Sequence, residues 1–148
     1  MRKMRASYTC GPASIANSLE CLGKRVSMVD LAQLAQTTYS EGTDFEPIVG
    51  AIKRCGFVPI PFEGPVGLAI PWLKKQVRLG RPVIVCTEEW SHWITVIGAL
   101  GQAFVVFDPL PHKGTKVLTV LEFEKLWMNK GEGRVCSGIA VKKRRRIK

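Results

Sequence analysis

Apolar residues recur at helical spacing through the first half of the chain, and each such stretch is closed by a glycine or opened by a capping residue. Gly23 follows the first stretch and Gly56 the third, which suits the left-handed end of a helix. The predicted helices cover 10–22, 28–36 and 45–55, with Ser27 and Thr43 as the caps of the second and third. The N-terminal half is therefore predicted to be helical.

The second half instead carries short β-branched and aromatic runs. Its predicted strands cover 57–62, 82–87, 92–97, 103–107, 115–120 and 135–141, with helices over 70–79 and 121–130. Two prolines restrict 57–62 to a sheet edge or an extended connector. The glycine-containing loop 98–102 joins its flanking strands as a hairpin, so that 82–87, 92–97 and 103–107 lie side by side and antiparallel. Helices first and a sheet afterwards predict an α+β domain.

The chain has 148 residues, of which 46% are hydrophobic and 23% charged, and this is enough for one domain with a core of its own. We assign 1–141 to that domain and 142–148 to a basic tail expected to be disordered. The five cysteines are scattered without a CxxC pair, which favours a reducing, cytoplasmic compartment over a disulfide framework. No apolar run reaches the roughly 18 residues of a membrane span, and the N-terminus has no signal-peptide core, so a soluble, unsecreted protein is expected.

The net charge of +10 lies mostly in the two ends of the chain. Three basic residues precede Ser7 and six lie within 142–148, which leaves 13 basic against 12 acidic residues between them. The tail thus offers an anionic partner, such as nucleic acid or a charged surface, a place to bind. A solvated tail that aids solubility or targeting is the favoured alternative.

The chemistry is predicted to centre on Cys10, where a loop gives way to the first helix. Pro12 suits the first turn of that helix, which places the thiol at the positive end of the helix dipole and near free N–H donors. Such a setting favours the nucleophilic thiolate. The other four cysteines stand in apolar contexts and are predicted to be structural.

His92 and Asp108 are the predicted partners of this thiol. His92 begins one strand and Asp108 ends the next, so that a hairpin between the two strands brings the carboxylate to the imidazole. A thiolate, an imidazole and an orienting carboxylate form a set for acyl transfer. A zinc site is less favoured, because a closed site needs four ligands and only three are present, and no cofactor is expected.

These residues resemble the papain-like cysteine peptidases of the bacteriocin-processing type, which cut peptides after a double-glycine leader. The resemblance spans nearly the whole chain, and the three site residues keep the family's order, 82 and 16 residues apart. It rests on Tyr8-Thr9-Cys10-Gly11-Pro12-Ala13, Leu22-Gly23, Gly42-Thr43-Asp44, Gly80-Arg81-Pro82-Val83-Ile84, Ser91-His92-Trp93 and Phe107-Asp108-Pro109. It implies a papain-like fold, in which a helical lobe bearing Cys10 packs on an antiparallel sheet, and proteolysis of a peptide or protein substrate. Because no membrane or ATPase segment is attached, a stand-alone domain is expected.

The chain departs from the family at one position, since Met4 stands where the resemblance implies an oxyanion glutamine. Losing one such donor slows acyl transfer by about two to three orders of magnitude. The backbone N–H groups of Cys10 and Gly11 and the hydroxyls of Ser7 and Tyr8 are the remaining candidate donors. The sequence therefore leaves two readings open: a thiol hydrolase or transferase, and a catalytically impaired papain-fold module that binds a peptide or protein assembly. Trp90 and Trp93 are candidates for the substrate groove, with core packing as an equal alternative.

Overall fold

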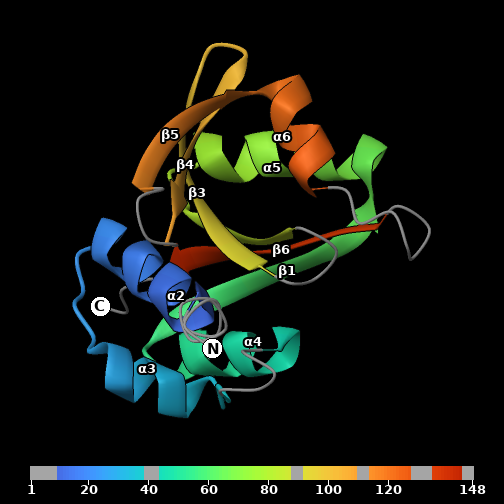
Figure 1. The fold of residues 1–148 in the computed structure, drawn as a ribbon. Helices are drawn as coiled ribbons and strands as arrows, with labels where there is room; N and C mark the ends of the chain where they lie inside the picture. Colours follow the sequence, from blue (N-terminus) through green and yellow to red (C-terminus); the bar gives the residue numbers. More distant parts are fainter. Residues whose placement is uncertain (1–9, 39–43, 88–91, 110–113, 128–134, 145–148) are drawn as a thin grey trace.

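The computed structural model describes residues 10–38, 44–87, 92–109, 114–127 and 135–144. In these ranges a six-stranded antiparallel sheet is covered by helices on both faces (Figure 1). Helices α2 (Cys10–Cys21), α3 (Met28–Leu34) and α4 (Phe45–Arg54) cover one face, while α5 (Val66–Arg78) and α6 (Val120–Trp127) cover the other. The predicted α+β class is therefore confirmed.

The sheet has the strand order β1-β6-β2-β3-β4-β5. The strands are β1 (Phe57–Pro65), β2 (Val83–Thr87), β3 (His92–Leu100), β4 (Ala103–Asp108), β5 (Gly114–Thr119) and β6 (Val135–Lys143). The three neighbours β2, β3 and β4 are antiparallel, as the sequence predicted. The proline-containing β1 lies at the edge and pairs only with β6 among the described strands, which suits the missing N–H groups of Pro59 and Pro61.

Two cores lie on opposite faces of the sheet, because alternate residues of a strand point to opposite sides. On β2, Ile84 and Cys86 join the core under α2, α3 and α4, whereas Val83 and Val85 join the core under α5 and α6. The second core contains the aromatic series Phe104, Phe123 and Trp127, all fully buried. Every side chain of β2 is thus buried, which explains why its sequence is a continuous apolar run.

Several element boundaries differ from the predicted ones. The predicted hairpin loop 98–102 is wrong: β3 continues to Leu100, and a two-residue turn at Gly101, whose φ is +59°, leads into β4. Helix α5 begins at Val66 rather than residue 70 and carries Pro71 within it. Strand β6 extends two residues past the predicted end, to Lys143.

One of the two predicted N-terminal helix caps is confirmed and the other is replaced by its neighbour. Ser27 accepts a hydrogen bond from the N–H of Asp30, at 3.1 Å, and this confirms it as the cap of α3. The cap of α4 is Asp44 rather than Thr43, which lies outside the described residues. Gly23 ends α2 with a φ of +92°, and the N–H of Lys24 returns to the carbonyl of Leu19, as expected of a helix closed by a left-handed glycine.

Candidate active site

Helix α2 begins at Cys10 and holds it against the sheet. The thiol is buried, and the backbone N–H of Trp93 on β3 donates a hydrogen bond to Cys10 Sγ at 3.3 Å. One turn further along α2, the carbonyl of Ser14 accepts a hydrogen bond from the hydroxyl of Thr95 on β3, at 3.2 Å. Two contacts between α2 and β3 therefore fix the position of the sulfur relative to the sheet, and a backbone donor faces it.

His92 and Asp108 meet at the end of the sheet where β3 begins and β4 ends. The ring nitrogen Nε2 of His92 lies 2.7 Å from Asp108 Oδ1, and both side chains are buried. The carboxylate accepts from this nitrogen, so that the proton of the neutral ring sits on Nε2 and Nδ1 is left as the basic nitrogen. Nδ1 is buried and has no hydrogen-bond partner among the described residues. The Cys10 thiol nevertheless lies close enough to the ring to raise the pKa of His92.

The environment of His92 favours the imidazolium. Burial of the ring lowers its pKa, but the hydrogen bond to Asp108 and the interaction with Cys10 outweigh burial and raise the pKa to about 9. A protonated imidazole beside a sulfur is the state that supports a thiolate. The arrangement can therefore keep a proton ready for a leaving group while the sulfur acts as a nucleophile.

Cys86 is a second thiol near the first, and it differs in its electrostatics. It lies opposite Trp93 in the register of β2 and β3 and belongs to the same core as Cys10. Burial and the nearby Cys10 raise the pKa of Cys86 to about 12. Cys86 therefore stays a thiol at neutral pH and is a structural residue, as the sequence predicted.

The structure decides between the two alternatives for Trp93. This residue is only 5% exposed and packs with Phe45, at 6.4 Å between ring centroids, so core packing holds for it and it does not line a groove. Cys21 lies on the exposed side of α2 rather than in an apolar setting. Trp93 still serves the site, but through its backbone N–H.

The structure describes some of the predicted oxyanion donors, namely those that lie in α2. Gly11 is buried in the first turn of α2, where backbone N–H groups have no partner within the helix. Met4, Ser7, Tyr8 and Trp90 lie outside the described residues. Cys10 and Gly11 thus remain the candidate donors that the structure describes.

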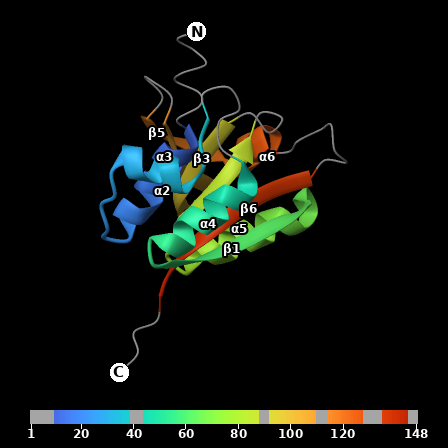
Figure 2. The same cartoon turned by 90° about the horizontal axis from the view of Figure 1, so that it is seen from below.

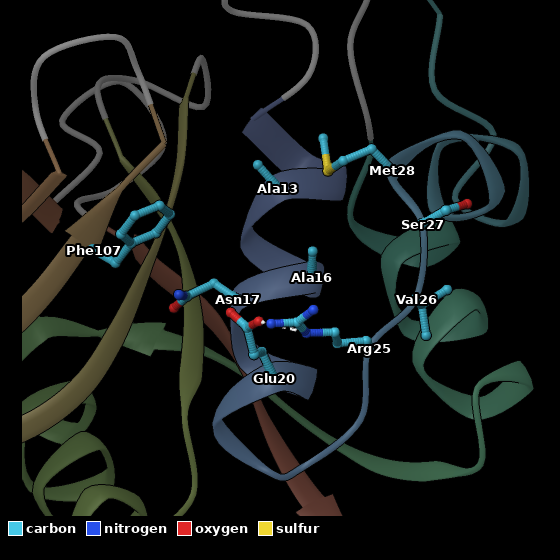
Figure 3. Close-up of a pocket in the computed structure, with 9 residues that line it drawn as sticks. All are labelled: Ala13, Ala16, Asn17, Glu20, Arg25, Val26, Ser27, Met28 and Phe107. Atoms are coloured by element: carbon cyan, nitrogen blue, oxygen red, sulfur yellow. Dashed lines mark ion pairs between the residues drawn. The ribbon is translucent and has the colours of Figure 1, made fainter.

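A groove beside α2, with a volume of about 440 Å³, was not predicted from the sequence. Figure 3 shows Ala13 toward the first turn of the helix, Asn17 and Phe107 on one side, and the Glu20–Arg25 ion pair at the far end. The groove is lined by Ala13, Ala16, Asn17, Glu20, Arg25, Val26, Ser27, Met28 and Phe107. One signal was available, because Ala13 and Ala16 leave small side chains on consecutive turns of the helix that bears Cys10.

Cys10 at the start of a helix packs against an antiparallel sheet that carries His92 and Asp108. This arrangement is that of a papain-like cysteine peptidase fold. The model of the peptidase C39 family matches residues 2–131, and the chain belongs to that family. A comparison with curated proteins found no match.

Solved structures show the same fold. The peptidase domain of Streptococcus ComA, a bi-functional ABC transporter of a quorum-sensing pathway, is 22% identical, with a TM-score of 0.72 over 92% of each chain. A double-glycine-motif protease from an AMS/PCAT transporter, solved with its leader peptide, is 19% identical, with a TM-score of 0.64 over 88% of this chain and 83% of that one. A C39-like peptidase from Bacillus anthracis is 19% identical, with a TM-score of 0.68 over 93% of this chain and 90% of that one. The resemblance read from the sequence is therefore confirmed at the level of family and fold.

Proposed function

We propose that this protein is a cysteine peptidase that cleaves peptide bonds with Cys10 as nucleophile, His92 as acid and base, and Asp108 as the orienting group. The observation that carries the proposal is the 2.7 Å contact between His92 Nε2 and Asp108 Oδ1, made beside a thiol that begins a helix. Family membership supports peptidase chemistry in general. The assignment of roles to the three residues is our own.

The reaction follows from these positions. The Cys10 thiolate attacks the peptide carbonyl carbon, and the negative charge on oxygen is met by N–H groups at the start of α2. When the C–N bond breaks, His92 gives its proton to the leaving amine and a thioester with Cys10 remains. His92 then takes a proton from water and the resulting hydroxide attacks the thioester carbon. When the C–S bond breaks, the carboxylic acid is released and the Cys10 thiolate is restored beside the protonated His92.

The groove beside α2 gives a peptide substrate a place to lie. Its lining begins at Ala13, three residues or about 4.5 Å along the helix from Cys10, and its volume is within the usual range of ligand sites. Met28 and Phe107 offer apolar contacts. Asn17 also lines the groove, and its side-chain amide offers a polar group beside these apolar contacts. These features support a peptide with apolar side chains close to the scissile bond.

The protease from the AMS/PCAT transporter was solved with a leader peptide, so a peptide with a double-glycine site is the first substrate to test here. Cleavage is measured by mass spectrometry with the wild type, with Cys10→Ala, and with Cys86→Ala as the matched control thiol. We expect cleavage by the wild type and by Cys86→Ala, and a loss of about four orders of magnitude or more for Cys10→Ala.

A second candidate function rests on Met4, which replaces the oxyanion glutamine that the family resemblance implies. In that case the protein binds peptides without efficient turnover. Tight peptide binding by the wild type and by Cys10→Ala alike, with no product from either, would favour this module and contradict the peptidase.

A further inference from the structure

Six cationic side chains gather at the end of the molecule where α2 stops, far from Cys10. They come from three separate parts of the chain, namely the connection after α2, the last turn of α4, and the end of β6 with the residue that follows it. They are Lys24, Lys53, Arg54, Lys142, Lys143 and Arg144, and we call them the basic end.

Two contacts bring these segments together. The ammonium of Lys24 donates to the carbonyl of Cys55, at 2.8 Å, next to Arg54. In the register of β1 and β6, Phe57 pairs with Lys143. Cys55 and Phe57 are two residues apart, so all three segments meet within a few residues of one another. Figure 2 shows the end of β6 beside the start of β1, with α4 next to both strands.

The charges of the basic end are open to solvent. All six residues are exposed, and within the described part of the chain none of them forms an ion pair. Glu20, the acidic residue near the end of α2, is paired instead with Arg25. Unpaired like charges repel one another, so this arrangement stabilises the fold little and is suited to an anionic partner.

The shape of the basic end indicates which anion it fits. None of the six residues lines either of two pockets that the described residues form, so the six cations lie on a surface outside those pockets. Among the described residues where these three segments meet, the aromatic side chain is Phe57, which is buried and offers no stacking surface for a base. Clusters of about four to eight Lys and Arg side chains attract the anionic headgroups of a membrane surface, and six exposed cations fall within that range.

We propose that the basic end binds the anionic headgroups of a lipid bilayer. The helix of Cys10 then points away from the membrane, because its 12 residues separate the thiol from the basic end by about 16 Å. The candidate site at the other end of α2 stays open to a peptide while the protein is bound. This inference goes beyond the proposed peptidase activity and does not depend on it. It also enlarges the basic segment 142–148 by three cations from the folded body, Lys24, Lys53 and Arg54.

The test is co-sedimentation of the full chain with vesicles of phosphatidylcholine alone and of phosphatidylcholine with 30 mol% phosphatidylglycerol. We expect binding to the anionic vesicles only, and a steep loss when salt is raised from 50 to 300 mM. Lys53→Gln/Arg54→Gln should weaken binding about 25-fold, since each cation near an anionic membrane contributes about fivefold. Lys142→Gln/Lys143→Gln should have a similar effect. The matched control is Lys116→Gln/Lys125→Gln, which removes two cations from β5 and α6, toward the opposite edge of the sheet from β1 and β6, and should leave binding unchanged.

Three results would overturn the proposal. Binding unaffected by Lys53→Gln/Arg54→Gln would show that the end of the chain acts alone, and an equal loss with Lys116→Gln/Lys125→Gln would show that only net charge matters. Binding to a 20-base-pair DNA duplex as tight as to anionic vesicles, at the same salt concentration, would assign the surface to nucleic acid instead. Because Cys10→Ala should bind vesicles as the wild type does, failure here is distinguishable from failure of the peptidase proposal.

Discussion

The two ends of helix α2 differ in burial and in charge. At its first residue the buried Cys10 meets a buried histidine and a buried aspartate, brought together from sites 82 and 16 residues apart in the chain. At its other end the helix closes with the exposed Glu20 and Cys21, and the connection that follows carries Lys24, the first of the six cations of the basic end. The first end concentrates a few groups in a low-dielectric site, where each interaction is strong, and the second spreads many charges in water, where each is weak. One helix thus holds a candidate chemical site and a candidate docking surface apart.

The largest expected effect is a loss of peptide cleavage when the site at the start of α2 is altered. Asp108→Asn keeps the shape of the side chain but removes the charge that orients His92, and we expect a loss of about two to four orders of magnitude in kcat/KM. Vesicle binding should not change. A variant with normal kcat/KM in peptide-cleavage assays would mean that Asp108 has no part in the reaction.

The second effect is a dependence of stability on pH. Because the pKa of His92 is about 9 in the folded protein and about 6.5 in the unfolded chain, its contribution to stability is fully present below pH 6.5 and is lost as pH rises to about 9. The loss should be on the order of 3 kcal/mol. It is measured by urea unfolding at pH 6 and pH 9, comparing the wild type with Asp108→Asn. An equal pH dependence in the two proteins would contradict this origin.

A smaller effect is expected at the other end of α2. Gly23 has a φ of +92°, so that Gly23→Ala forces a side chain into the left-handed region and should destabilise the protein by about 1 kcal/mol. Gly50 lies inside α4 with open space around it, and Gly50→Ala should be neutral or stabilising by up to about 1 kcal/mol. Thermal unfolding compares the pair, and equal shifts of the two would refute the argument. Peptide cleavage should be unaffected by either change.

The smallest effect concerns a buried hydroxyl one turn below Cys10. Ser14 Oγ is buried and has no hydrogen-bond partner among the described residues, whereas Ser18 Oγ donates to the Ser14 carbonyl. Ser14→Ala should therefore leave stability unchanged or raise it by up to about 1 kcal/mol, while Ser18→Ala should lower it by about 1 kcal/mol. Denaturant unfolding of both variants measures the difference. A destabilised Ser14→Ala protein would reveal a partner of that hydroxyl.

The order of elements was predictable because each element left a local signal, and the proximity of His92 to Asp108 was predictable from the strands that carry them. Cys10 precedes a helix with Pro12 in its first turn, and the hairpin of β3 and β4 follows from two apolar runs around a glycine-containing segment. The pairing of β3 with β4 brings the end of β4 next to the start of β3, where His92 and Asp108 meet, although the register shift between Val96 and Gly98 was not predicted. The contact between two residues at the ends of neighbouring strands can thus be predicted from sequence, whereas the register itself cannot.

Other features depend on packing between distant segments and left no such signal. The burial of Trp93 depends on Phe45, which approaches it from a different element. The groove beside α2 depends on Phe107 from β4 and on the chain around Val26. The basic end combines cations that are up to 120 residues apart in the chain, so the sequence showed only its C-terminal part.

The most direct test of the central claim is the titration of His92 itself. The claim is that Asp108 and Cys10 together hold this imidazole protonated near neutral pH. Proton NMR of the ring signals follows both histidines, and His112→Gln identifies which signal belongs to His92. We predict a midpoint near pH 9 that falls in Asp108→Asn and in Cys10→Ala. A midpoint near 6.5, unchanged in both variants, would contradict the assignment of these three residues as one catalytic unit.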